Sequence, residues 1–231
     1  MEYIVTRQEM QAIDSYSISK IGIPAEVLME RAALEVVRVI EKVNVSKGRI
    51  LIVVESGNNG GDGLAAARIL LERGYLVDIY HIGGIKKQTK QFQTQMNILH
   101  QLGVRLRKSI PHKDYAVVVD GIFGVGLSRT IEDPQKKVIE ALNQMQAVKV
   151  AIDMPSGIDA TSGEILGVAF HADYTVTFGL KKLGMYFFDG IDYCGKIICA
   201  NVGFPQKAIA QVKPQIYAYD KSDLCKLPKR I

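Results

Sequence analysis

The sequence predicts an α/β fold in three layers, in which helices cover both faces of a doubly wound, mostly parallel sheet. Three β-branched runs, at 50–54, 116–120 and 148–152, show little alternation of apolar and polar residues. Such runs are typical of parallel strands buried on both faces. Segments with helical spacing of apolar residues lie between the runs. Strands that alternate with helices form parallel sheets whose ligands bind at the carboxyl edge.

Two helices are expected before the first run. Thr6 and Glu9 have the spacing of a capping box, in which the threonine hydroxyl accepts from the Glu9 amide and the glutamate side chain reaches back. This helix runs to about Lys20 and ends at Gly22 and Pro24. A second helix begins at Ala25, and its apolar stripe should pack on the sheet or on a partner subunit. The stripe consists of Leu28, Met29, Ala32, Ala33, Val36, Val37 and Ile40.

A glycine-rich stretch, 55–63, joins the strand at 50–54 to a helical pattern at 64–73. We expect a turn there, with positive φ angles and bare backbone facing a ligand. The amides of the following helix N-terminus favour anions, so a phosphate-bearing ligand fits. The alternative is a tight strand-to-helix connection that binds nothing. The glycines concerned are Gly57, Gly60, Gly61 and Gly63.

The stretch matches neither common phosphate-binding pattern. No Lys-Ser or Lys-Thr follows the glycines, which disfavours phosphoryl transfer of the Walker type. Glu55 stands where the first glycine of G-x-G-x-x-G would be. The carboxamides of Asn58 and Asn59 and the carboxylate of Asp62 add groups that can read a polar ligand.

The remaining elements follow the same alternation of strands and helices. Gly74 should cap the helix before a strand at 76–82, and Gly103 should close the next helix. Asp133 is expected to cap a further helix, with Pro134 at its first position. Two late strands, at 174–178 and 196–200, belong at one side of the sheet.

Composition narrows the class of protein. With 231 residues, 48% of them hydrophobic, the chain can form one substantial core. No apolar run approaches the ~20 residues of a bilayer crossing, and the N-terminus has no apolar segment of a secretory signal. We therefore expect a soluble, cytoplasmic protein without a membrane partner.

Cysteines and charges exclude further classes. The three cysteines include no C-x-x-C pair, which argues against a disulfide framework or a zinc site and favours free thiols. The net charge of +5 is spread along the chain without a basic stripe interleaved with aromatics, so no nucleic-acid partner is expected. Attraction toward an anionic dinucleotide accounts for the positive net charge equally well.

Polar residues follow three strands and should meet in one crevice at the carboxyl edge. They lie at 58–62, from Asp120 onward, and at 153–156. Any single aspartate after a strand is more often a turn or cap residue, but three such ends favour a site. Ser156 lies outside G-x-S-x-G and has no histidine in triad order, so a serine hydrolase is not expected.

Four segments in order resemble the YjeF N-terminal domain family, the NAD(P)H-hydrate epimerases. In chain order they are Leu28–Ala33, Gly57–Gly63 with Ala66-Ala-Arg68 after it, Asp120–Leu127 and Asp153–Asp159. The resemblance runs over nearly the whole chain. It implies a Rossmann-like three-layer αβα domain at 1–218 with the two N-terminal helices as an extension. The tail at 219–231 resembles the linker to a dehydratase domain that this chain lacks.

The resemblance also implies a site. Asp153 is the candidate catalytic acid or base, and Arg129 is suited to clamp a phosphate. Asn59, Asp120 and Ser156 would bind a potassium ion, and hard oxygen donors suit such a cation. The implied substrate-binding residues are Asn58, Asn59, Gly60, Gly61, Asp62, Gly124, Val125, Gly126, Leu127, Ser128, Arg129, Thr130 and Asp153.

The implied activity is interconversion of the R and S forms of hydrated NADH and NADPH (NADHX and NADPHX). A homodimer and functional pairing with an NAD(P)H-hydrate dehydratase are implied with it. The alternative is a non-catalytic scaffold of the same fold that binds a nucleotide or a protein. Retention of Asn59, Asp120, Asp153 and Ser156 together favours catalysis, because a scaffold has no chemical need for all four.

The chain departs from the family pattern at two points. Lys182 matches a lysine that the family flanks with prolines, but here its neighbours are Lys181 and Leu183. The alternative for Lys182 is therefore a solvated surface charge. Glu55 replaces a usual glycine, which questions how closely a ligand approaches the start of the glycine stretch.

Overall fold

A six-stranded, entirely parallel sheet forms the centre of the computed structural model, which describes residues 2–44, 46–83 and 88–219. Its strand order is β3-β2-β4-β5-β6-β8. The strands are β2 (Ile50–Val54), β3 (Val77–His81), β4 (Val117–Gly121), β5 (Val148–Ile152), β6 (Tyr174–Phe178) and β8 (Lys196–Ala200). Every residue of β2 and β4 is buried, so the sequence prediction of strands covered on both faces is confirmed.

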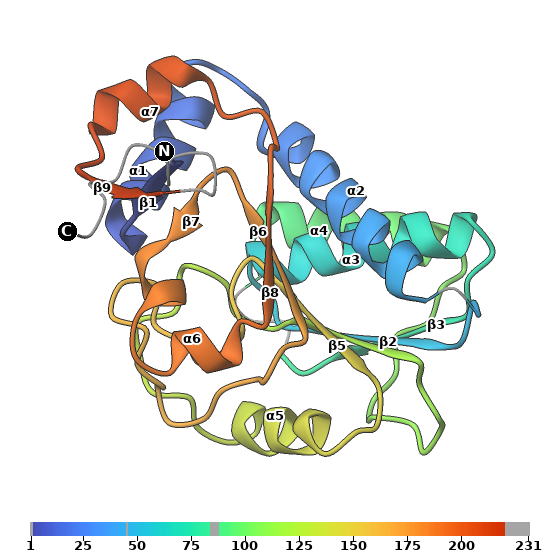
Figure 1. The fold of residues 1–231 in the computed structure, drawn as a ribbon. Helices are drawn as coiled ribbons and strands as arrows, with labels where there is room; N and C mark the ends of the chain where they lie inside the picture. The colour runs from blue at the N-terminus through green and yellow to red at the C-terminus, as the bar shows by residue number, and fades with distance from the viewer. Residues whose placement is uncertain (1, 45, 84–87, 220–231) are drawn as a thin grey trace.

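Helices cover both faces of this sheet (Figure 1). Helices α2 (Ala25–Val43), α3 (Asn58–Glu72) and α4 (Lys90–Gln101) lie on one side, and α5 (Gln135–Asn143) lies on the other. Alternate residues of β2 separate the two layers: Ile52 packs in the cluster with α2 and α3, whereas Val53 packs in the cluster with α5. The predicted three-layer fold is therefore confirmed.

The apolar stripe of α2 is buried against the chain's own sheet and α3 rather than left for a partner. The helix before α2, predicted from its capping box, is also present. Helix α1 (Arg7–Ser19) begins after Thr6, whose hydroxyl accepts from the Glu9 amide while the Glu9 carboxylate accepts from the Thr6 amide. Both N-terminal helices are thus confirmed: α1 ends within one residue of the predicted Lys20, and α2 begins at Ala25 as predicted.

A second, three-stranded sheet lies beside α1 at one end of the molecule (Figure 1). Strand β1 (Glu2–Val5) pairs in parallel with β7 (Lys181–Lys182) and antiparallel with β9 (Ile216–Ala218). Helix α7 (Gln206–Val212) packs on α1, and the short helix α6 (Gly190–Tyr193) precedes β8. Sequence analysis missed this sheet, because strands this short have no local pattern of their own.

Two local predictions were wrong. Helix α3 begins at Asn58, so Gly60, Gly61 and Gly63 belong to the helix and Gly57 is its cap residue. None of the four has the positive φ predicted for a turn. Asp133 does not cap α5: the cap position is Pro134, without a side-chain cap bond, and the Asp133 carboxylate instead lies 2.6 Å from Nζ of Lys137. Gly74 and Gly103 do have positive φ directly after α3 and α4, as predicted.

Candidate functional site

A cavity of about 490 Å³ opens at the carboxyl edge of the sheet, between α1, α2, the start of α3 and the loop after β4. The register explains the position: Asp120 pairs with Val53 and with Ala151, so β2, β4 and β5 end at the same level. Among the predicted substrate-binding residues, those that line the cavity are Asn58, Asn59, Asp62, Gly124, Val125, Gly126, Leu127, Ser128, Arg129 and Asp153. Gly60, Gly61 and Thr130 do not line it.

The glycines of α3 are required by packing. A methyl group at Gly60 would lie 1.7 Å from the carbonyl oxygen of Glu55, and one at Gly63 would lie 2.8 Å from Cγ1 of Val54. Glycine therefore lets the first turn of the helix approach the end of β2 closely. This contact places the free amides of the helix N-terminus, with Asn58 and Asn59, at the cavity wall.

Asp153 follows β5 directly and lines the cavity although only 7% of its surface is exposed. Its φ of 65° is in the left-handed region, which aspartate adopts at a cost of about 1–3 kcal/mol. The conformation turns the carboxylate toward donors: the Val125 amide lies 3.0 Å from Oδ2, and Nζ of Lys182 lies 2.6 Å from Oδ1. Asp153 thus joins β5, the loop after β4 and β7.

Lys182 is fully buried, so its interpretation as a solvated charge is wrong. Strand β7 pairs it with Val5 of β1, which directs the side chain inward to the cavity. Besides the Asp153 carboxylate, its ammonium donates to Thr177 Oγ1 at 2.6 Å and to the Phe178 carbonyl at 3.1 Å. All three protons of the ammonium therefore have acceptors.

A cluster of oxygen donors lies under the loop after β4. Asp120 is fully buried, and its carboxylate accepts from the Ser156 hydroxyl at 2.6 Å and from the Ser156 amide at 2.7 Å. The carbonyl of Phe123 lies 3.2 Å from the same hydroxyl. Burial raises the pKa of Asp120 to about 6, although the bonds from Ser156 and from the Ile122 amide lower it. Asp120 and Ser156 do not themselves line the cavity.

Asn59 lies at the junction of this cluster and the cavity. A methyl group at Gly124 would lie 2.7 Å from Oδ1 of Asn59 and 3.0 Å from Oδ2 of Asp153, so both side chains flank that glycine. Nδ2 of Asn59 is buried and has no hydrogen-bond partner among the described residues. Such an orphaned group is rare and is typical of a position that meets a ligand or ion.

Two further carboxyl groups face the cavity. Asp14, from α1, was missed by sequence reasoning, while Asp62, from α3, was predicted. Burial raises the pKa of Asp14, and the charge of Asp153 raises it further. The pKa of Asp62 is raised well above its ordinary value by burial, then by Asp153 and Asp14. Asp14 lies one helical turn after the buried Met10, and this position on the inward face was the available signal.

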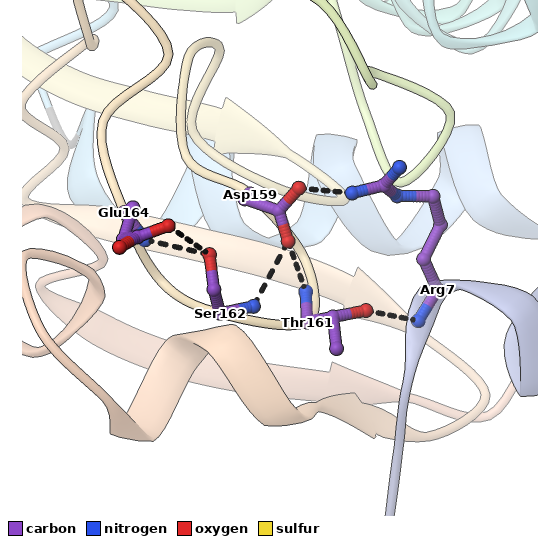
Figure 2. A network of polar contacts seen from close by, with 5 residues as sticks. All are labelled: Arg7, Asp159, Thr161, Ser162 and Glu164. Atoms are coloured by element: carbon purple, nitrogen blue, oxygen red, sulfur yellow. Dashed lines mark hydrogen bonds and ion pairs between the residues drawn. The ribbon is translucent and has the colours of Figure 1, made fainter.

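Asp159, the last residue of the segment that starts at Asp153, does not line the cavity and instead joins a network of polar contacts with Arg7 (Figure 2). Its carboxylate forms an ion pair with Arg7 and accepts from the amides of Thr161 and Ser162 at 2.8 and 2.9 Å. The Arg7 amide in turn donates to Oγ1 of Thr161 at 3.0 Å. These contacts fasten the first turn of α1 to the loop after β5. Helix α1 also carries Asp14, further along its length.

Glu55 also lies outside the cavity lining. Its carboxylate accepts from Nε2 of Gln135 at 2.6 Å and from the Ser56 amide at 2.8 Å. The residue therefore links the end of β2 to α5, and it does not obstruct the start of α3.

Comparison with known proteins places the chain in a family. The profile described as "YjeF-related protein N-terminus" matches residues 25–184. The chain belongs to this family.

Curated relatives of the YjeF-related chain cover most of its length. A protein named NAD(P)H-hydrate epimerase from Leuconostoc citreum (strain KM20) is 39% identical over 87% of this chain and 90% of its own. One of the same name from Limosilactobacillus reuteri (strain DSM 20016) is 40% identical over 86% and 94%. A third, from Weissella koreensis (strain KACC 15510), is 37% identical over 92% and 97%.

A solved structure shares the fold. The crystal structure of the yeast protein ynu0 matches with a TM-score of 0.74, covers 95% of this chain and 97% of its own, and is 22% identical. None of the helices in the described ranges is both long and apolar enough to span a bilayer.

Proposed function

We propose that this chain is an NAD(P)H-hydrate epimerase, an isomerase that interconverts the R and S forms of NADHX and NADPHX. The family membership and the curated relatives of that name support the activity. The observation that carries the proposal in the structure is the position of Asp153. Its carboxylate lines a cavity at the sheet edge, beside the N-terminus of α3.

The stereocentre is a hemiaminal carbon, C6 of the reduced nicotinamide. The ring nitrogen can expel the hydroxyl as water once that oxygen is protonated, which leaves an iminium, and water can return on the other face. A carboxyl group that exchanges a proton with the oxygen serves this route. The Asp153 carboxylate at the cavity wall is placed to stabilise the transient positive charge of the ring.

The cavity lining also offers groups complementary to the phosphates of the substrate. Free amides at the start of α3 and the carboxamides of Asn58 and Asn59 offer donors. Arg129 is exposed at the cavity lining and has no acidic partner among the described residues, so its guanidinium is free to clamp a phosphate. Leu28 and Met29 of α2 supply an apolar wall for the rings.

We propose a potassium site at Asn59, Asp120 and Ser156. The support is chemical: the buried Asp120 carboxylate has no cationic partner among the described residues, and carboxylate, carboxamide and hydroxyl oxygens are the hard donors that such a cation prefers. The described residues contain no group of three His, Cys, Asp or Glu suited to a transition metal. A bound potassium ion would supply positive charge against Asp120 and order the loop after β4. Thermal unfolding in KCl and in choline chloride at equal ionic strength tests this: a higher Tm in KCl that Ser156→Ala removes supports it.

A homodimer, cytoplasmic location and functional pairing with a dehydratase stay predictions. Cys194 and Cys199 are free thiols, which suits a reducing compartment. Sedimentation equilibrium tests the dimer. The linker prediction for 219–231 falls outside the described residues apart from Tyr219.

The activity is tested by incubating R-NADHX with the protein and a dehydratase specific for the S form. Wild type should accelerate consumption of the R form, and Asp153→Asn should reduce kcat by about 10²–10⁴-fold. Full epimerisation by Asp153→Asn would remove Asp153 from the role. In H₂¹⁸O the product hydroxyl should carry ¹⁸O, because the original oxygen leaves as water. A wild type that neither epimerises nor responds in Tm to NADP and KCl favours the scaffold alternative.

A further inference from the structure

Inversion at C6 requires two proton-transfer groups. The oxygen that leaves must be protonated on one face of the ring, and the water that returns must lose a proton on the other face. One carboxyl group fixed in a wall reaches one face only. The cavity therefore needs a partner for Asp153, and this requirement rests on the proposed epimerase function.

The cavity lining contains three carboxyl groups from three different elements: Asp153 after β5, Asp62 from α3 and Asp14 from α1. They differ in their contacts. The Asp153 carboxylate is held by Lys182 and by the Val125 amide. Asp62 makes no hydrogen bond or ion pair with any residue that the structure describes, so its carboxyl group is available to a substrate. It also projects from the first turns of α3, three residues after the orphaned amide of Asn59.

We propose that Asp62 is the second catalytic residue, which protonates the departing hydroxyl while Asp153 accepts a proton from the water that returns on the opposite face. In the forward direction the Asp62 proton moves to the hydroxyl oxygen, the C6–O bond breaks, and the nitrogen lone pair forms C=N. Water then adds to C6, C=N returns its electron pair to nitrogen, and the Asp153 carboxylate takes the proton of the water. The reverse direction exchanges the two roles, and the proton returns to Asp62 through solvent between turnovers.

The charges around Asp62 suit an acid that keeps its proton. Burial raises its pKa, and the charges of Asp153 and Asp14 add to the effect. Two basic residues line the cavity, and neither pairs with Asp62: Lys182 is paired with Asp153, and Arg129 is exposed in the loop after β4. The residues that α2 contributes, Ala25, Leu28, Met29 and Ala32, are uncharged, as is Thr89 before α4.

Asp14 acts on the reaction through Asp62. It makes no hydrogen bond or ion pair with a described residue, and its charge is one of the causes that raise the pKa of Asp62. Replacing it with asparagine removes this cause. The pKa of Asp62 then falls, and the protonated form is lost at a lower pH.

The experiment measures kcat against pH for wild type, Asp62→Asn, Asp14→Asn and the control Asp192→Asn, which alters an exposed aspartate of α6 outside the cavity. R-NADHX is the substrate. We expect kcat of Asp62→Asn to fall about 10²–10⁴-fold with KM changed less than threefold. Asp14→Asn should keep substantial activity, with the alkaline limb of its pH profile moved to lower pH. Asp192→Asn should match wild type.

The outcomes separate the two proposals. If wild type does not epimerise R-NADHX, the proposed function fails. If wild type is active and folded Asp62→Asn keeps its kcat, the assignment of Asp62 fails while the function stands. The assignment of Asp62 also fails if the alkaline limb of the pH profile does not move in Asp14→Asn. If Asp62→Asn does not fold, as judged by circular dichroism, the position of the alkaline limb of the pH profile in Asp14→Asn alone decides whether the assignment of Asp62 stands.

Discussion

Nζ of Lys182 lies 2.6 Å from Oδ1 of Asp153, and the lysine side chain is completely buried. The two residues come from different sheets: Asp153 follows β5 of the central sheet, and Lys182 belongs to β7 of the small one. A single ion pair therefore couples the small sheet to the cavity. Its ammonium makes the charge of a buried catalytic carboxylate tolerable.

Lys182→Met should destabilise the protein, because it leaves the Asp153 carboxylate buried without its cation. We expect the free energy of unfolding in urea to fall by about 3 kcal/mol. Adding Asp153→Asn to Lys182→Met should recover part of this loss, since the uncompensated charge is then gone. A double variant no more stable than Lys182→Met would contradict the pairing.

The central sheet could be predicted because burial on both faces leaves a continuous apolar run, as in β2 and β4. Asp120 lies near the end of β4 and Asp153 directly follows the neighbouring strand β5, so the edge of the sheet that carries the site was predictable as well. Lys182 was harder, because its burial depends on pairing of β7 with β1, nearly the whole chain away. No local pattern records such a contact.

The start of α3 shows why local reasoning failed elsewhere. Glycine is a poor helix former, so a run of glycines suggested a turn. Tertiary packing overrides this preference, because a side chain at Gly60 would overlap the backbone of Glu55. Asp14 was missed for a related reason: from sequence alone, a polar residue on a helix is expected to face solvent, and only the tertiary structure shows that it lines a cavity.

Gly60→Ala and Gly57→Ala form a matched pair that tests the packing. A methyl group at Gly60 would overlap the Glu55 carbonyl, whereas one at Gly57 meets nothing within 4 Å. Gly57 has a φ of −86°, which alanine adopts freely. We expect Gly60→Ala to lose about 3 kcal/mol or more of unfolding free energy and Gly57→Ala to lose less than about 1 kcal/mol. Equal stability in urea would show that the close approach is not required.

Asp78, a buried residue of β3, should make stability depend on pH. Burial alone would raise its pKa, but bonds from Arg107, Lys113 and Tyr115 outweigh this and lower the pKa below 3.8. The contribution of Asp78 is therefore complete above about pH 4 and is lost as the pH falls through the lower folded value.

Asp78→Asn tests this dependence. At pH 7 the variant should be about 2–3 kcal/mol less stable than wild type, because its donors lose an ionised acceptor. The difference should narrow when urea unfolding is repeated toward pH 3. A constant difference between pH 7 and pH 3 would contradict the assignment, and exposed Asp114→Asn should show no difference at either pH.

Arg7 should control substrate affinity through the position of α1. It fastens the first turn of α1 to Asp159, and α1 carries Met10, Gln11 and Asp14 to the cavity wall. The Arg7 and Asp159 side chains are only 16% and 12% exposed, so solvent replaces their contact poorly. Arg7→Met should let this wall shift.

We expect Arg7→Met to raise KM for R-NADHX about tenfold, equivalent to about 1.4 kcal/mol, with kcat changed less than twofold. The reason is that the helix serves substrate binding, whereas the groups around Asp153 are held by other elements. Arg73→Met is the matched control, because Arg73 pairs with Glu41 on the surface and is 41% exposed. A loss of kcat without a rise in KM would place Arg7 in the chemistry instead, and equal kinetics in both variants would show that the Asp159 contact does not position α1.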